Sequence, residues 1–280
     1  MKKISVHDLE TKGYVSLPYP PRLKKAMIKT VKSWQAFCAL RIDVKKALPY
    51  SNNADGVGYE FKEGEGRNAD RKENFDITTS GKVWLEKNIE RIKNKTALSF
   101  VKDATALVEI AKPFISQFAS EVEKIFAMHG FAKEVKEGSG KYFFRFIHYA
   151  GDRNIGSETA SAHVDQSGFT PHLFETEPGF EILDLTTKKW IPQSFTEGEM
   201  LIINSMQIQL RSQGKLKALC HRVVATPKTA KIGRYSAVCF VQFKDTAKYD
   251  KERCGRLQEK KPGFNYTMKF GDFQKLFKRD

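Results

Sequence analysis

The sequence changes character near Gly140, and this change limits the possible folds more than any other feature. After this residue, short runs rich in branched and aromatic residues alternate with Gly, Pro, Asp and Lys. Short strands spaced in this way predict a β-sandwich or barrel. The runs are KYFFRFIHYA, GFEILDL, KWIPQ, MLIIN, HRVVAT and RYSAVCFVQF.

The first half of the chain has a helical pattern instead. Apolar residues recur at spacings of three and four, which predicts helices over 21–40, 81–95 and 103–129. Asp103 is the expected N-cap of the third helix, and Gly130 its expected end. The segment 49–70, rich in Gly, Asn and Asp, is predicted to be a loop.

Together these patterns predict an α+β protein that is mainly β with supporting helices. We expect a helical supporting region over 1–140 and a β core over 141–245. A C-terminal extension over 246–280 is expected to pack back on the core.

Composition excludes several classes of protein. The chain of 280 residues is 40% hydrophobic and 29% charged, which is ordinary for a globular protein and too apolar for a disordered one. Its apolar runs are shorter than the roughly 18 residues of a membrane span. The N-terminus lacks the apolar segment of a secretory signal, and the four cysteines form no CxxC pair. We therefore expect a cytoplasmic monomer with no membrane partner.

The net charge of +15 leaves the partner class open. Positive charge attracts nucleic acid, acidic lipid or an anionic substrate. The basic residues are spread along the chain, however, without a dense run interleaved with aromatic residues. A lysine-rich solvated surface is the simpler interpretation, so no specific nucleic-acid partner is expected.

One group of residues has the pattern of a metal site. His163 and Asp165 are two positions apart, and such residues point to the same side of a strand. His221, at the start of a later β-type run, is the best candidate for a third ligand. Two histidines and one carboxylate are typical of non-haem Fe(II) oxygenases. His-x-Asp alone is common by chance, so the pair by itself is weak support.

A second motif follows His221. Arg234 and Ser236 share one face of a predicted strand, where a guanidinium and a hydroxyl can together hold a carboxylate. The far carboxylate of 2-oxoglutarate is one candidate. Arg-x-Ser alone could also be an ordinary edge-strand pair, but the ordered set of motifs is far more specific than any one part.

This ordered set resembles the isopenicillin N synthase-like branch of the Fe(II)/2-oxoglutarate-dependent dioxygenases. The resemblance covers nearly the whole chain and includes GYVSLPYP, WQAFCAL, GVGYEFK, DRKENFDI, FFRFIHYAG, HVDQSGFT, PGFEILD, LIIN, QGKLKALCHRVV and RYSAVCF. It implies a distorted jelly-roll, or double-stranded β-helix, with O2 as oxidant. It implies Fe(II) bound by His163, Asp165 and His221. The co-substrate 2-oxoglutarate would be bound by Arg234, Ser236 and Tyr149.

The chain also departs from the family pattern. Ile147 stands where the family often has Asn, and Asn204–Gln207 replaces the usual Asn-x-Gly-Asp. These positions flank the cavity, so the substrate stays open. Candidate substrate residues are Phe143, Arg145, His172, Gln207 and Gln209. Arg145 could equally pair with a structural acid, and His172 could equally be a solvated loop histidine.

The resemblance implies oxidation of a C–H bond of a small molecule by hydroxylation, desaturation or ring closure. The basic surface favours an anionic substrate, such as an amino-acid-derived metabolite. The first alternative is a nucleic-acid demethylase, but such enzymes typically carry a second arginine where this chain has Phe240. The second is an oxidase that uses no 2-oxoglutarate, like isopenicillin N synthase. A non-enzymatic relative is the third, and the presence of the whole ligand set argues against it.

Overall fold

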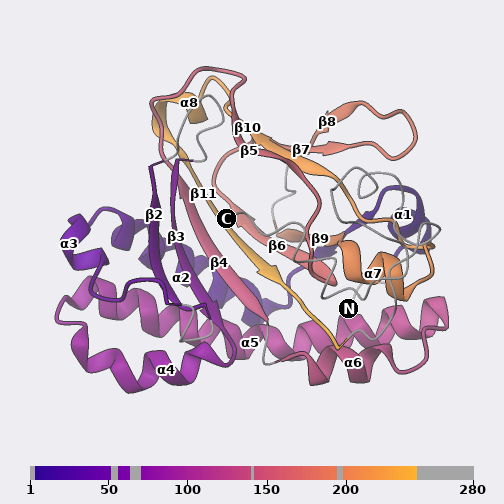
Figure 1. The fold of residues 1–280 in the computed structure, drawn as a ribbon, viewed down its shortest axis with the longest axis horizontal. Coiled ribbons are helices and arrows are strands. Elements are labelled where there is room, and N and C mark those ends of the chain that lie inside the picture. The colour runs from indigo at the N-terminus through magenta and orange to yellow at the C-terminus, as the bar shows by residue number, and fades with distance from the viewer. Residues whose placement is uncertain (1–3, 52–55, 64–70, 140–141, 194–197, 245–280) are drawn as a thin grey trace, which may run out of the picture.

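The computed structural model describes residues 4–51, 56–63, 71–139, 142–193 and 198–244. Two β-sheets pack against each other, and helices cover the outer face of the larger sheet (Figure 1). This double-sheet arrangement confirms the predicted fold class, a jelly-roll with supporting helices. The expected C-terminal extension lies outside the described residues.

The larger sheet has seven strands in the order β1-β9-β6-β11-β4-β3-β2, and each pairs antiparallel with its neighbours. The strands are β1 (Tyr14–Pro18), β2 (Gly58–Lys62), β3 (Lys72–Thr78), β4 (Phe143–Tyr149), β6 (Phe169–Glu175), β9 (Glu199–Asn204) and β11 (Arg234–Phe240). Because β1, β2 and β3 precede Gly140, the first half of the chain supplies strands as well as helices. The prediction that 49–70 is all loop is wrong, since β2 lies within it.

The smaller sheet has four strands in the order β5-β10-β7-β8. They are β5 (Glu158–His163), β10 (His221–Val224), β7 (Phe180–Leu183) and β8 (Trp190–Pro192). Each β-type run predicted from the sequence overlaps one of the observed strands. Strands β5 and β6 were not among the predicted runs.

Two long helices form most of the outer layer. Helix α2 (Pro21–Cys38) and helix α5 (Lys95–Phe126) pack together and against the larger sheet. The Trp34 ring joins the layers, 5.0 Å from Phe100 of α5 and 6.2 Å from Phe146 of β4, measured between ring centroids. The other helices are α1 (Val6–Thr11), α3 (Ile42–Lys45), α4 (Gly81–Asn88), η3 (Ile89–Arg91), α6 (Phe131–Glu137), α7 (Met206–Arg211) and α8 (Thr229–Ile232). None of the described helices is long and apolar enough to cross a membrane.

Both predicted ends of the third helix are wrong. Helix α5 begins eight residues earlier than predicted, where the Asn94 side chain accepts hydrogen bonds from the second and third helical residues. Asp103 lies inside the helix and is buried there, 2.6 Å from the ammonium of Lys29. The helix ends at Ala127, which adopts the left-handed conformation, rather than at Gly130.

Alternation along the strands separates two apolar cores. On β4, Phe144 and Phe146 face the helices, whereas Ile147 and Tyr149 face the smaller sheet. Strands β9 and β11 alternate in the same way, as period-two geometry requires. Side chains of both sheets therefore line the space between them, and the candidate site lies in this space.

Candidate functional site

The structure brings His163, Asp165 and His221 together. His163 is the last residue of β5 and lies directly opposite His221, the first residue of β10, in the antiparallel pair. Side chains of such directly opposed residues lie on the same face of a sheet. Asp165 follows β5 by two residues, and its backbone carbonyl accepts a hydrogen bond from the first residue of α7.

The three side chains converge on one point. Oδ1 of Asp165 lies 3.6 Å from Nε2 of His163 and 3.8 Å from Nε2 of His221. One donor atom from each residue lies within 4.8 Å of the other two. The two imidazole centroids are 4.4 Å apart. Two imidazole nitrogens and one carboxylate around a single point fit a divalent metal such as Fe(II).

Backbone carbonyls orient both imidazole rings for metal binding. Nδ1 of His163 lies 2.7 Å from the Ser161 carbonyl, and Nδ1 of His221 lies 3.2 Å from the Leu219 carbonyl. With the proton held on Nδ1, each Nε2 presents a lone pair toward Asp165. Burial and the neighbouring imidazole lower the pKa of His221 to about 4, so this ring is neutral at neutral pH. His163 is more open, with 44% of its side chain exposed.

The Asp165 carboxylate is held from its other side. Oδ2 accepts a hydrogen bond of 2.7 Å from the Thr170 hydroxyl, which lies 3.1 Å from the Ser205 hydroxyl in turn. Both hydroxyl groups are buried. The sequence analysis missed Thr170, although it lies only five positions after Asp165.

The residues predicted to bind 2-oxoglutarate also lie together, on the inner face of the larger sheet. Arg234 and Ser236 of β11 are buried, and Tyr149 of β4 lies directly opposite Arg234 in the strand register. The guanidinium carbon of Arg234 lies 5.9 Å from the centre of the Tyr149 ring.

A residue that the sequence analysis missed contacts this group. Glu175, the last residue of β6, forms an ion pair with Nη2 of Arg234, and Nε of Arg234 donates to the Glu177 carbonyl at 3.0 Å. Burial raises the pKa of Glu175 above its usual value, although the Arg234 charge opposes this shift. The sequence analysis did not predict β6, which carries Glu175, because Pro171 interrupts the β-type pattern of this strand.

His172 lies on β6 between the two groups, not in a solvated loop. The residue is buried, and its ring contacts Phe180, which in turn lies 5.3 Å from the His221 ring. Burial, followed by the positive charge of Arg234, lowers the pKa of His172 far below its usual value. A neutral imidazole therefore lies beside the candidate site.

Arg145 of β4 has a partner on the neighbouring strand. Its Nε and Nη2 each lie 2.9 Å from an oxygen of Asp76 on β3, so this guanidinium pairs with a structural acid. Phe143 is next to it, with its ring 5.1 Å from the Arg145 guanidinium carbon. Phe143 and Tyr149 lie at opposite ends of β4, which at about 3.3 Å per residue separates them by roughly 20 Å.

Gln207 and Gln209 form side-chain hydrogen bonds with the backbone. They lie on helix α7 rather than on a strand. The Gln207 amide donates to the Phe243 carbonyl at 3.1 Å, and the Gln209 amide oxygen accepts from the Ala218 N–H at 2.7 Å. These bonds to the backbone support a structural role for both side chains. His172, in contrast, lies near both the metal group and the Arg234 group, through Phe180 and Glu175.

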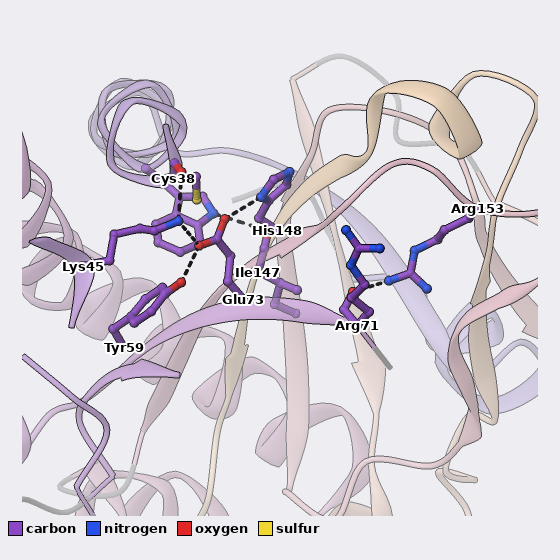
Figure 2. Close-up of polar contacts among 9 residues, drawn as sticks. Cys38, Lys45, Tyr59, Arg71, Glu73, Ile147, His148 and Arg153 are labelled. Atoms are coloured by element: carbon purple, nitrogen blue, oxygen red, sulfur yellow. Dashed lines mark hydrogen bonds and ion pairs between the residues drawn. The ribbon is translucent and has the colours of Figure 1, made fainter. Parts of the chain in front are cut away.

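The described residues contain a second group of possible metal ligands, Cys38, Glu73 and His148. Figure 2 shows His148, Lys45 and Tyr59 directed at the Glu73 carboxylate. The contacts are 2.7 Å to Nδ1 of His148, 2.6 Å to Nζ of Lys45 and 2.7 Å to the Tyr59 hydroxyl.

This second group fits a metal poorly. The Lys45 ammonium already supplies a positive charge at the carboxylate. Burial and the nearby Glu73 charge raise the pKa of Cys38 well above its usual value, so the thiol keeps its proton, whereas metals bind the thiolate. We therefore assign this group a structural role, in which it joins helices α2 and α3 to the sheet.

The Glu73 cluster provides a stability prediction. Glu73→Gln is expected to lower the free energy of unfolding by about 3 kcal/mol, because it leaves the buried Lys45 ammonium unpaired. Burial alone would raise the pKa of Glu73, but hydrogen bonds from His148, Lys45 and Tyr59 outweigh it and lower the pKa to about 2. The stabilisation is therefore complete above the unfolded pKa of about 4.5 and decreases as the pH falls toward 2.

Urea unfolding between pH 7 and pH 3 measures this difference. The control is Glu109→Gln, since the half-exposed Glu109 pairs with Lys82 and Lys112 on the surface. This change is expected to cost less than about 1 kcal/mol. Equal effects of the two substitutions at pH 7 would show that the buried cluster is no more important than a surface pair.

Comparison with known proteins adds three structural likenesses. A rice dioxygenase for auxin oxidation superposes with a TM-score of 0.72 at 20% identity, covering 97% of this chain and 87% of that one. The Arabidopsis thaliana dioxygenase for auxin oxidation 1, in a 2-oxoglutarate complex, superposes with a TM-score of 0.67 at 17% identity and 86% coverage of both chains. Neurospora crassa T7H, bound to α-ketoglutarate and 5-formyluracil, gives 0.70 at 16% identity, covering 97% and 88%. At these identities the likenesses establish the fold.

The search of curated proteins finds no match. A family comparison does identify the β core: residues 143–243 match the 2OG-Fe(II) oxygenase superfamily. This segment runs from β4 through β11 and contains both candidate groups. Over residues 143–243 the chain therefore carries an enzyme domain of the 2OG-Fe(II) oxygenase superfamily, whose members use Fe(II), 2-oxoglutarate and O2.

Proposed function

We propose that this protein oxidises a C–H bond of a small, anionic or amino-acid-derived metabolite, with Fe(II) held by His163, Asp165 and His221. The observation that supports the proposal best is the convergence of the three ligands. Both Nε2 atoms lie within 3.8 Å of the same carboxylate oxygen, and backbone carbonyls hold both rings in the tautomer that a metal needs.

Arg234, Ser236 and Tyr149 would hold the far carboxylate of 2-oxoglutarate. Fe(II) bound there, with 2-oxoglutarate as the electron donor, would activate O2, which is the oxidant. The contribution of the chain is to bind and orient. The Arg234 guanidinium offers two-pronged contacts to a carboxylate, and the Ser236 hydroxyl adds one more. The apolar residues between the sheets, such as Ile147, Phe180 and Val223, keep bulk water from the site.

The surroundings of the site favour a small substrate. The ligands lie between two packed sheets, and His163 is the most exposed of them. A substrate would therefore approach from the exposed His163 side. The structural neighbours include a dioxygenase for auxin oxidation and a protein bound to 5-formyluracil, and auxin and 5-formyluracil are both small molecules. The net charge of +15 favours an anionic substrate.

The same charge motivates the alternative, a nucleic-acid demethylase. Lys24, Lys25 and Lys32 are exposed on α2, which packs on the outer face of the larger sheet. The candidate iron ligands lie on its inner side. A polynucleotide bound to these lysines would therefore lie on the opposite side of the sheet from the reaction site, which disfavours the alternative.

Succinate release tests the proposal. The protein is incubated with Fe(II), 2-oxoglutarate and O2, first with a panel of carboxylate-bearing metabolites and then with methylated oligonucleotides. We expect at least one small metabolite to stimulate succinate formation. Stimulation by oligonucleotides alone would favour the demethylase. Substrate oxidation that proceeds without 2-oxoglutarate would favour an oxidase in which Arg234 holds the substrate itself.

The contact between Thr170 and Asp165 provides a further prediction. Thr170→Val removes the hydroxyl that donates to Oδ2 but keeps the side-chain shape. Loss of such a partner typically costs 10–100-fold in metal affinity or activity, so Fe(II) affinity is expected to fall by about tenfold or more. Anaerobic metal titration measures the affinity. The control is Thr105→Val, because Thr105 is a buried threonine of α5 whose hydroxyl bonds the Val101 carbonyl. A similar loss in both variants would contradict the assigned role.

A further inference from the structure

The Arg234 guanidinium already has a carboxylate partner within the chain. Its Nη2 pairs with Glu175, and its Nε donates to the Glu177 carbonyl. The backbone places Glu175 there as well, because Glu175 of β6 lies directly opposite Ser236 of β11 in the strand register. One carboxylate of the chain therefore faces both residues that would hold the far carboxylate of 2-oxoglutarate.

Both members of this ion pair are buried. The exposed fraction is 5% for the Glu175 side chain and 3% for Arg234. Water can do little to screen charges at such a position. A second carboxylate at the same guanidinium would place two negative charges beside one positive charge, and like charges in a buried site disfavour each other.

We infer that Glu175 is an internal competitor for Arg234 and sets the 2-oxoglutarate affinity of the site, an inference that rests on the proposed function. The far carboxylate of the co-substrate must displace Glu175 from the guanidinium in order to bind. The cost of this exchange raises the 2-oxoglutarate concentration that the protein requires.

Two observations bear on the cost of displacement. Burial raises the pKa of Glu175. Protonation of Glu175, which weakens its bond to Arg234, therefore costs less free energy than protonation of an ordinary glutamate. The residue is also the last one of β6, so its side chain can swing away without breaking the middle of the strand ladder. The exchange therefore needs a movement of one side chain rather than a rearrangement of the sheet.

Calorimetric titration of 2-oxoglutarate under anaerobic conditions, with Mn(II) in place of iron, tests the inference without turnover. Glu175→Gln keeps the size of the side chain but removes its charge, and it is expected to lower the Kd for 2-oxoglutarate by about tenfold or more. Glu175→Asp, which shortens the side chain and keeps the charge, is expected to give a smaller decrease. Having both variants keeps the test decisive if one of them folds poorly.

Two controls isolate the effect. Glu181→Gln also removes a glutamate from an ion pair with an arginine, here Arg222 at 2.8 Å on the smaller sheet, and should leave the Kd unchanged. 2-Oxopentanoate has the same 2-oxo acid end but no far carboxylate. Its affinity should be the same for the wild-type protein and Glu175→Gln, because it does not use Arg234.

The outcomes separate the two proposals. Unchanged or weaker 2-oxoglutarate binding by folded Glu175→Gln, with clear binding by the wild-type protein, would overturn the inference and leave the proposed function standing. It would show that Glu175 supports Arg234 rather than competing for it. Failure of wild-type protein and variants alike to bind 2-oxoglutarate with Mn(II) would overturn both.

Discussion

Replacement of Asp165 by alanine is expected to abolish turnover and to weaken Fe(II) binding by more than about a hundredfold. Loss of a group that only hydrogen-bonds a metal ligand typically lowers metal affinity or activity 10–100-fold. Loss of the Asp165 carboxylate itself removes a metal bond and the only negative charge among the three ligands. No other carboxylate of the described residues joins this group. His163→Ala and His221→Ala are expected to give similar losses.

Anaerobic Fe(II) titration and circular dichroism on the same samples measure metal binding and folding together. Cys220→Ala is the control, because Cys220 is adjacent to His221 but is absent from the ligand group, and neighbouring residues of an extended chain point to opposite sides. This variant should keep its iron affinity. Near-normal turnover by any one of the three alanine variants would refute the assigned ligand set.

The second large effect is expected at Arg234. Arg234→Leu removes the one positive charge that the account assigns to the far carboxylate of 2-oxoglutarate. Hydrogen bonds to charged groups contribute about 1.5–3 kcal/mol against about 1 kcal/mol for neutral ones. The 2-oxoglutarate requirement should therefore rise roughly tenfold to a hundredfold, with smaller increases for Ser236→Ala and Tyr149→Phe.

Titration of 2-oxoglutarate against each variant tests this ranking. The double variant Arg234→Leu with Glu175→Gln is the appropriate control for folding, because the single variant leaves the buried Glu175 charge unpaired. If Arg234→Leu is folded and its 2-oxoglutarate requirement is unchanged, the arginine does not hold the co-substrate.

Local patterns in the sequence predict a large part of the β core. The runs around β4, β9 and β11 consist of residues that favour strands, and the periodicity of α2 reflects its buried stripe. The convergence of His163, Asp165 and His221 was also predicted, because residues two apart on a strand share a face and the motifs occur in a fixed order.

The missed features depend on contacts between distant parts of the chain. Strand β2 is short and glycine-flanked, and its pairing with β3 stabilises it in a way that local composition does not reveal. Glu175 lies 59 positions before Arg234, and only the β6–β11 register brings them together. Arg145 also depends on a distant contact. Its pair with Asp76 on the neighbouring strand supports a structural role rather than a substrate contact.

A crystal structure with Mn(II) and 2-oxoglutarate, grown without oxygen, would locate the metal. We expect one anomalous-scattering peak at about 2 Å from Nε2 of His163, Nε2 of His221 and a carboxylate oxygen of Asp165. We also expect the far carboxylate of 2-oxoglutarate on Arg234. A peak at Cys38, Glu73 and His148 instead, or no metal between the two histidines at saturating Mn(II), would contradict the proposed iron site.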